Sequence, residues 1–286
     1  MVLVDFNGMA VGSILGQLNK GVELSEGLVK HIILNNLRMY RNKYPEDEHG
    51  RMVICTDSWS WRRSIFPEYK ARRTDNKEKD DRDWDEIFRL INVTTSDIKE
   101  NFPYAVISVD SAEADDIIGA LTMDAMADVW GENVVIVSGD KDFIQLHKFG
   151  NEVLQYAPMQ QKMVKEDNPA RYIFDHIMKG DKSDGVPNVL SPDNSFTDKI
   201  RQAPMRKKQL DEWWENKDNL KGVMEPEVFR NYIRNRELID LKRTPDNIKE
   251  ESIRQLKDYK YPNRTNILSY LIDNNMKMLI ECAGEF

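Results

Sequence analysis

The 286-residue chain has few of the residues that build sulfur or nitrogen metal sites. Its two cysteines, Cys55 and Cys282, follow no metal-ligand spacing and indicate a reducing compartment rather than a disulfide scaffold. Its four histidines include no pair at helical spacing, which argues against a histidine-based zinc site. Oxygen ligands are therefore what this sequence offers to a metal ion.

Other signals are also missing. No apolar run reaches the length of a membrane span, and the start MVLVDFNG lacks the basic region and cleavage site of a secretion signal. We therefore expect a protein of the cytoplasm that has no membrane partner. No glycine-rich phosphate loop is present, which disfavours a kinase or another nucleotide-binding enzyme.

The chain is organised around an apolar segment that two carboxylates follow. Residues 134–137 read VVIV, and a Ser-Gly turn leads from them to Asp140 and Asp142. This pattern predicts a buried strand with two same-facing carboxylates at its carboxyl end, where ligands bind in open α/β sheets. Unit charges about 4 Å apart repel by roughly 4 kcal/mol at an effective dielectric of about 20, so water or a cation must relieve the pair. The motif alone also fits an acidic surface loop.

Three further segments repeat this arrangement. Residues 2–6 and the segment MVICTD predict strands that end in Asp5 and Asp57. A strand over 104–109 leads into a helix that opens at residue 110 or 111 and carries Glu113, Asp115 and Asp116 in its first turn. Helices are expected over residues 25–40, 84–101, 170–179 and 265–280, and a β-hairpin over 153–164.

Strands that alternate with helices predict an α/β fold, with a mainly parallel central sheet, helices on both faces and a helical C-terminal region. We expect residues 1–180 to form the α/β domain and residues 181–286 the helical region packed on it. The carboxyl ends of parallel strands share one edge, so many acids can converge there. The candidates are Asp5, Asp57, Glu113, Asp115, Asp116, Asp140, Asp142, Asp181 and Asp184.

Nine converging carboxylates predict a divalent-metal site. Their number accounts for the whole net charge of −8. Carboxylates with water suit Mg²⁺, and Mn²⁺ can substitute. Two such ions about 4 Å apart can activate a water and stabilise the leaving oxygen in an attack on a phosphodiester.

Two basic segments supply the charge that a phosphate backbone needs. Residues 59–82 combine aromatic and basic side chains and fit an exposed loop or short helices, although a solvated charged face explains the composition equally well. The run KIRQAPMRKK over residues 199–208 holds five bases and no acid. An acid cluster beside basic segments indicates a metal-dependent nuclease.

These motifs, in this order, resemble those of the flap endonuclease, or 5′ nuclease, family. The resemblance rests on EADD, SGDKDF and GDKSDGVPNV, on the strand ends LVDF and CTD, and on WRRSIFPEYKARR, which is similar to the basic arch of that family. LVKHIILNN, DFIQLHK, APMQQKMVK, TPDNI and the ending GEF are similar to the phage ribonucleases H of the T-even type. The likeness runs from Leu3 to Phe286 and implies a PIN-like 5′ nuclease fold.

The resemblance implies roles for individual residues. Asp5, Asp57, Glu113, Asp115 and Asp116 correspond to ligands of the ion nearer the scissile phosphate. A second ion is expected at Asp140, Asp142, Asp181 and Asp184. Lys70, Arg73 and Arg62 match bases that contact the reacting phosphate, and Arg63 and Arg72 are expected to contact DNA.

The chain departs from the family after GDKSDGVPNV, where a Gly-x-Gly-x-Lys-Thr-Ala helix start usually follows. LSPDNSFTDKIRQAPMRKK stands there instead. We expect the basic run to make the replacement contact with duplex DNA, through Lys199, Arg201, Arg206, Lys207 and Lys208.

The resemblance implies a Mg²⁺-dependent 5′ to 3′ exonuclease and flap endonuclease. Its expected substrates are RNA·DNA hybrids and duplex or flap DNA, and its expected role is the removal of RNA primers during lagging-strand synthesis. It would act as a monomer in the host cytoplasm, with a single-stranded-DNA-binding protein as a possible partner. Two alternatives stay open: a PIN-type endoribonuclease, which uses a smaller acidic quartet, and a non-catalytic replication scaffold that keeps the fold.

Overall fold

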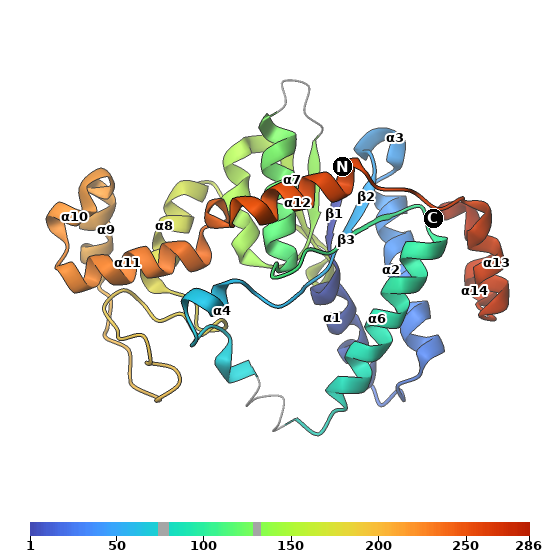
Figure 1. Cartoon of the computed structure of the whole chain (residues 1–286), viewed down its shortest axis with the longest axis horizontal. Coiled ribbons are helices and arrows are strands. Elements are labelled where there is room, and N and C mark those ends of the chain that lie inside the picture. The colour runs from blue at the N-terminus through green and yellow to red at the C-terminus, as the bar shows by residue number, and fades with distance from the viewer. Residues whose placement is uncertain (74–79, 128–132) are drawn as a thin grey trace.

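Short apolar runs form the strands of a six-stranded sheet at the centre of the protein (Figure 1). The structure is a computed structural model that describes residues 1–73, 80–127 and 133–286. The strand order is β3-β2-β1-β4-β5-β6. The first five run parallel, and β6 pairs antiparallel with β5 in the predicted hairpin. The strands are β1 (Val2–Asp5), β2 (Met52–Cys55), β3 (Ala105–Ile107), β4 (Val134–Val137), β5 (Val153–Ala157) and β6 (Lys162–Val164). The mainly parallel α/β architecture is therefore confirmed.

Four of the predicted helices, those at residues 25–40, 84–101, 170–179 and 265–280, begin close to the expected residue. Ser25 caps α2 by accepting a hydrogen bond from the Leu28 N–H at 3.3 Å, and Asp83 caps α6 through the Glu86 N–H at 2.9 Å. The longer α-helices are α1 (Phe6–Leu18), α2 (Glu26–Lys43), α6 (Trp84–Asn101), α7 (Ala114–Ala127), α8 (Pro169–Lys179), α9 (Lys207–Glu215), α11 (Pro226–Ile239), α12 (Asp246–Lys257) and α13 (Thr265–Asp273). Shorter ones are α3 (Glu46–His49), α4 (Arg62–Ile65), α10 (Leu220–Val223), α14 (Lys277–Ile280) and the 3₁₀ segments η1 (Lys141–Glu152), η2 (Pro158–Gln160), η3 (Lys217–Asn219), η4 (Leu241–Arg243) and η5 (Ala283–Glu285).

Alternate residues of each strand enter two different cores. Val2 and Val4 of β1 face a cluster with α1, α2, α6 and α13, whereas Leu3 faces a cluster with α7, η1 and α12. This alternation follows from the two-residue period of a strand and gives a layer of helices on each face of the sheet. Both faces are buried, so the sheet presents ligands only at its ends.

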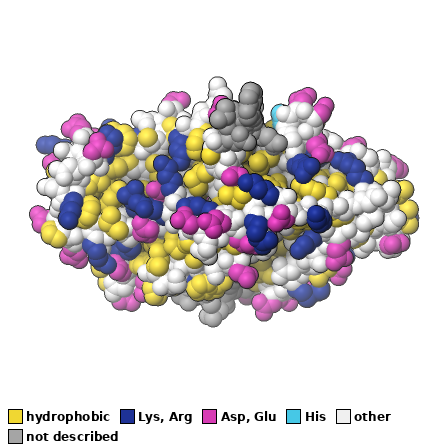
Figure 2. Space-filling view, turned by 45° about the horizontal axis from the view of Figure 1, so that its top comes forward, with side chains coloured by type: hydrophobic (Ala, Val, Ile, Leu, Met, Phe, Trp, Pro, Cys, Tyr) yellow, Lys and Arg dark blue, Asp and Glu magenta, His cyan; other side chains and the backbone are white. Residues whose placement is uncertain are grey.

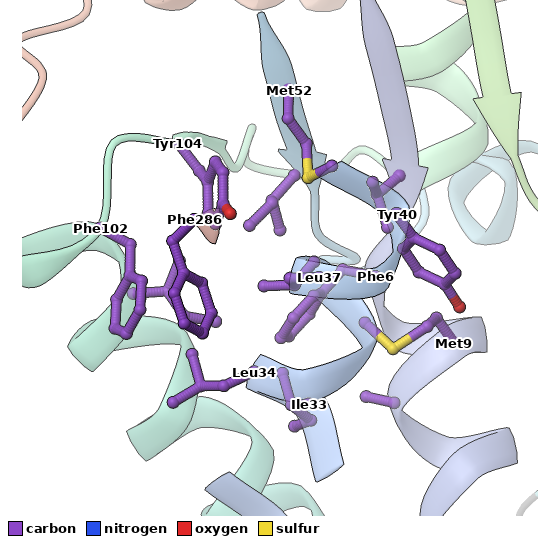
Figure 3. Packing of buried hydrophobic residues seen from close by; sticks show 14 of the residues in the cluster. Phe6, Met9, Ile33, Leu34, Leu37, Tyr40, Met52, Phe102, Tyr104 and Phe286 are labelled. Atoms are coloured by element: carbon purple, nitrogen blue, oxygen red, sulfur yellow. The ribbon is translucent and has the colours of Figure 1, made fainter. Parts of the chain in front are cut away.

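The end of the chain returns to the first core. Phe286 is 1% exposed, and its ring lies 5.1 Å from that of Phe102, close to Tyr104 and Leu34 (Figure 3). On the opposite face, α12 packs against α7. A separate apolar cluster joins α8, α9, α10 and α11 around Trp213 and Phe174. Residues after 180 contribute to each of the three clusters described here, so the packing crosses the boundary at residue 180 that the sequence suggests.

Two helix predictions need correction. The helix after β3 begins at Ala114 rather than at residue 110 or 111, since Ser111 adopts a left-handed backbone with φ of 65°. The helix predicted over 265–280 is two helices, broken at Asn275 with φ of 54°. In the first of these two helices, Leu268 and Ile272 are about half exposed, at 47% and 52%, whereas Ile267 and Leu271 are buried in the core.

Of the basic segment 59–82, residues 59–73 and 80–82 are described. Residues 59–73 contain α4 and a turn in which Tyr69 is buried. The predicted arch residues 74–79 lie outside the described residues. In the described part of the chain, no helix has the length and apolar character needed to cross a membrane.

Candidate metal centre and nucleic-acid interface

Three strand ends bring carboxylates to one edge of the sheet. Asp5 ends β1 and caps α1, where it accepts hydrogen bonds from the Gly8 N–H at 3.2 Å and the Ser138 hydroxyl at 2.8 Å. A Cβ at residue 8 would come within 2.7 Å of the Asp5 carboxylate oxygen, so a larger residue there would displace this carboxylate. Asp57 follows β2 and accepts from the Ala114 N–H at 2.8 Å, which ties the start of α7 to the same edge.

Asp140 follows β4 and caps η1 by accepting from the Asp142 N–H at 2.9 Å. It lines, with the other strand-end acids, a cleft of about 500 Å³. The charged residues of its wall are Asp5, Asp57, Glu113, Asp115 and Asp140 on the acidic side and Arg63, Lys70 and Arg73 on the basic side. The structure thus brings together five of the nine predicted acids and three of the predicted bases.

Four of the five acids of this cleft, all except Glu113, resist ionisation. Burial, with the charges of neighbouring carboxylates, raises the pKa of Asp57 and of Asp140 to about 6. Burial raises the pKa of Asp5, and burial with the charges of Asp140 and Asp5 raises that of Asp115 well above its usual value. Crowded carboxylates with raised pKa values fit a divalent cation, which would relieve their repulsion and accept oxygen ligands.

This electrostatic strain predicts a pH dependence of stability. Asp57 and Asp140 have folded-state pKa values of about 6, above the unfolded value of 3.8, so between these values the native state binds more protons than the unfolded state and stability falls as the pH rises. In excess EDTA, the unfolding midpoint should therefore be higher at about pH 5 than at about pH 7.5. Added Mg²⁺ should raise the midpoint more at the higher pH. Calorimetric scans at the two pH values measure both effects, and a metal-free protein that gains stability with rising pH would contradict them.

Lys70 lies between the cleft and the turn at residues 180–185. Its ammonium pairs with Glu113 and lies 3.4 Å from Asp184, and Arg73 pairs with Asp184 at 2.6 Å. Burial opposes the charge of Glu113, but Lys70 and Arg62 lower its pKa to about 2. These pairs neutralise the bases in the free protein. An incoming phosphate would have to compete with Glu113 and Asp184 for Lys70 and Arg73.

Arg62 and Asp116 form a buried pair behind the cleft. Their side chains are 3% and 0% exposed and are joined by two hydrogen bonds of 2.8 and 2.9 Å. Asp116 also accepts from Thr244, Trp61 and the Glu113 N–H, and Arg62 donates to the Leu238 carbonyl. No oxygen of Asp116 remains for an ion, and Arg62 cannot reach solvent. This geometry favours a structural role for the pair over the predicted roles, in which Asp116 binds metal and Arg62 contacts phosphate.

The turn GDKSDG presents Asp181 and Asp184 at the end of α8. Gly180 has φ of 69°, and a Cβ there would lie 2.3 Å from the Val186 carbonyl oxygen, so only glycine fits. Asp181 accepts from the Ser183 N–H at 2.7 Å, and His176 and Ser183 hold its pKa below the usual range despite burial. The Asp184 carbonyl accepts from the Lys70 N–H at 2.8 Å, which links this turn to the basic segment.

His176, on α8, is a neighbour of this group that the sequence does not single out. Its Nε2 lies 3.2 Å from Asp142 and 3.6 Å from Asp181. Burial opposes protonation, but these two carboxylates raise the pKa of His176 to about 10. The sequence gives no signal for this role, because one histidine five residues before Asp181 matches no ligand spacing.

The basic run at residues 199–208 lies apart from the cleft. Lys199, Arg201, Arg206, Lys207 and Lys208 are all exposed, and none lines the cleft wall. Asn188 holds the loop that carries them by donating to the Ala203 carbonyl at 2.8 Å. Arg72 is also exposed, beside Arg73. On the face drawn in Figure 2, basic and acidic side chains are interleaved, so no uniformly positive surface extends over that face.

Known proteins match this chain over its whole length. The family "5′-3′ exonuclease, N-terminal resolvase-like domain" matches residues 1–172, and the family "T4 RNase H, C terminal" matches residues 168–286. The ribonuclease H of Enterobacteria phage T4 is 30% identical over 292 aligned residues, which cover 99% of this chain and 95% of the phage protein. The 5′-3′ exonuclease of Buchnera aphidicola (Schizaphis graminum) is 31% identical, but the match covers only 55% of this chain and 53% of that protein.

Solved structures agree with the fold. A bacteriophage T5 flap endonuclease, crystallised as a pseudo-enzyme-product complex with DNA and metal ions, has a TM-score of 0.62 at 15% identity and covers 90% of this chain and 97% of its own. A T5 protein co-crystallised with metal ions has a TM-score of 0.59 at 16% identity and covers 91% and 99%. With family matches from residue 1 to residue 286, this chain belongs to the 5′-3′ exonuclease family and is a nuclease of the type that includes the phage T4 ribonuclease H.

Proposed function

We propose that this nuclease is a Mg²⁺-dependent 5′ to 3′ exonuclease and flap endonuclease that removes RNA primers during lagging-strand DNA replication. Its substrates would be RNA·DNA hybrids and duplex or branched DNA. The observation that carries this proposal is the cleft that Asp5, Asp57, Asp115 and Asp140 line together with Lys70. Acids there suit divalent ions, and a base at the same wall suits phosphate.

Two groups of oxygen ligands support two ions. The strand-end acids of the cleft would hold the first. Asp142, Asp181 and Asp184 would hold or approach the second. Asp140 lies between the two groups in sequence, and its carboxylate accepts a hydrogen bond from the Asp142 N–H. The T5 neighbours crystallised with metal ions support this use of the fold. Bound Mg²⁺, or Mn²⁺ in its place, would supply an activated water and stabilise the charge on the leaving oxygen.

The chain's own bases would position the nucleic acid. Lys70 and Arg73 would exchange their carboxylate partners for the reacting phosphate, and Arg63 at the cleft wall would contact the neighbouring one. Arg72 and the exposed run 199–208 would bind duplex backbone farther from the reacting bond. We further propose that the protein acts as a monomer in the host cytoplasm and that a single-stranded-DNA-binding protein is a partner.

Cleavage assays test this function. Purified protein with Mg²⁺ should release short products from 5′-labelled RNA·DNA hybrids and 5′-flap duplexes, and excess EDTA should abolish the release. The same assay with a blunt 3′-labelled duplex that has a blocked 5′ end serves as a control for contaminating nucleases. Salt-sensitive binding without cleavage would favour the non-catalytic scaffold, and cleavage of single-stranded RNA alone would favour a PIN-type endoribonuclease.

A further inference from the structure

Asp142, His176 and Asp181 form a compact three-donor group beside the cleft. One ligand atom from each lies within 4.8 Å of the others. The donors come from η1, from α8 and from the turn that follows α8, three segments that pack on one another. Because α8 and η1 are in direct contact, the group is part of the folded body and not an accident of one flexible loop.

The imidazole is aimed into this group. Its Nε2 atom is buried and has no aligned hydrogen-bond partner among the described residues, although Asp142 and Asp181 are 3.2 and 3.6 Å away. The ring of Tyr172, one turn earlier on α8, stacks on the ring of His176 at 6.0 Å with 10° between the planes. A ring nitrogen that points at two carboxylates without an aligned hydrogen bond is placed to act as a ligand once a metal ion displaces its proton.

The distances match those between donors that share one ion. Metal–nitrogen and metal–oxygen bonds of about 2.1 Å place adjacent donors about 3.0 Å apart in an octahedron and about 3.4 Å apart in a tetrahedron. The two measured distances from Nε2, 3.2 and 3.6 Å, lie close to these values. The two carboxylate donors lie within 4.8 Å of each other, so an adjustment of these side chains would bring all three donors onto one ion.

The nitrogen donor changes which ion the group prefers. Mg²⁺ takes oxygen ligands and waters, whereas imidazole favours first-row transition ions. We propose that His176 is a direct ligand of the ion held by Asp142 and Asp181, and that it makes this position select a transition ion such as Mn²⁺ over Mg²⁺. This deepens the proposed function and rests on it for the presence of an ion here. The cleft described above has no histidine in its wall, so the two positions differ in chemistry.

Pulsed electron paramagnetic resonance of bound Mn²⁺ tests the proposal without any substrate. The wild-type protein should show modulation from a directly coordinated ¹⁴N nucleus, and the variant His176→Asn should lose it. Calorimetric titration should show the Mn²⁺ affinity of the variant at this position reduced by about 10- to 100-fold, and the Mg²⁺ affinity changed by less than about threefold. The control variant is His31→Asn, which removes a histidine of α2 that is not part of the three-donor group. It should match the wild type in both measurements.

The outcomes separate this inference from the proposed function. Mn²⁺ bound to the wild type without ¹⁴N modulation would overturn the role of His176, whatever the variant does, and would leave Mg²⁺-supported cleavage untouched. Equal loss of Mn²⁺ and Mg²⁺ affinity in His176→Asn would also overturn the selectivity. Clear ¹⁴N modulation in a protein that cleaves none of the substrates would instead uphold the ligand and reject the nuclease reaction proposed above.

Discussion

The substitution Asp140→Asn is expected to reduce cleavage by roughly 10³-fold while DNA binding persists. Asp140 lines the cleft and caps η1 through the Asp142 N–H. Asparagine keeps the capping oxygen, so the local fold should survive, but it removes one negative charge from the cation site. Single-turnover cleavage of a 5′-flap duplex measures the rate, and binding is measured separately with Ca²⁺ in place of Mg²⁺.

The same substitution should stabilise the protein when metal is absent. Burial, together with the charge of Asp142, raises the pKa of Asp140 to about 6, so loss of its charge removes a desolvation cost and relieves repulsion. In EDTA, we expect the unfolding midpoint to rise by about 2–4 °C, which corresponds to roughly 1 kcal/mol in a chain of this size. Lower activity with higher stability is a combination that simple misfolding cannot produce.

Asp83→Asn is the matched control for both measurements. Asp83 caps α6 in the same way that Asp140 caps η1, but it does not line the cleft. This variant should cleave like the wild type and unfold at the same temperature within error. Wild-type cleavage by Asp140→Asn, or a fall of its midpoint in EDTA, would remove Asp140 from the metal site.

The backbone plan of the site could be predicted from local sequence. The runs before Asp5, Asp57 and Asp140 are apolar and short, and each ends in a turn, which is enough to predict parallel strands that share an edge. The turn that carries Asp181 could be predicted in the same way, because Gly180 and Gly185 favour the positive φ values that the turn adopts. These features depend on residues next to each other in the chain.

Side-chain direction could not be predicted in this way. Asp115 and Asp116 are adjacent on α7, but one faces the cleft and the other is fully buried against Arg62. Which of them faces the cleft depends on where α7 begins, and the left-handed Ser111 shifts that start. His176 joins the second group only because α8 packs against η1, a tertiary contact with no local signature.

The neighbours Arg62 and Arg63 make the sharpest test of this difference. Both lie in the basic segment, and composition alone gives them similar roles. In the structure, Arg62 is 3% exposed and paired with Asp116, whereas Arg63 lines the open cleft. We therefore expect Arg62→Ala to lower the free energy of unfolding by about 3–5 kcal/mol, because it leaves the carboxylate of Asp116 buried and unpaired.

Arg63→Ala should weaken nucleic-acid binding and leave stability nearly unchanged. Its effect on the free energy of unfolding should stay within about 0.5 kcal/mol. Its nucleic-acid affinity should fall for every sequence, and the slope of log affinity against log salt should decrease by about one. Urea unfolding and binding titrations at several salt concentrations, carried out on both variants, give the four values.

The double variant Arg62→Ala/Asp116→Ala separates a lost charge pair from a lost phosphate contact. Removing both partners leaves no unpaired buried charge, so part of the lost stability should return and the coupling between the two positions should be at least about 1 kcal/mol. If Arg62→Ala instead unfolded like the wild type and lost cleavage alone, Arg62 would reach the substrate, and the buried pair would not describe the protein in solution.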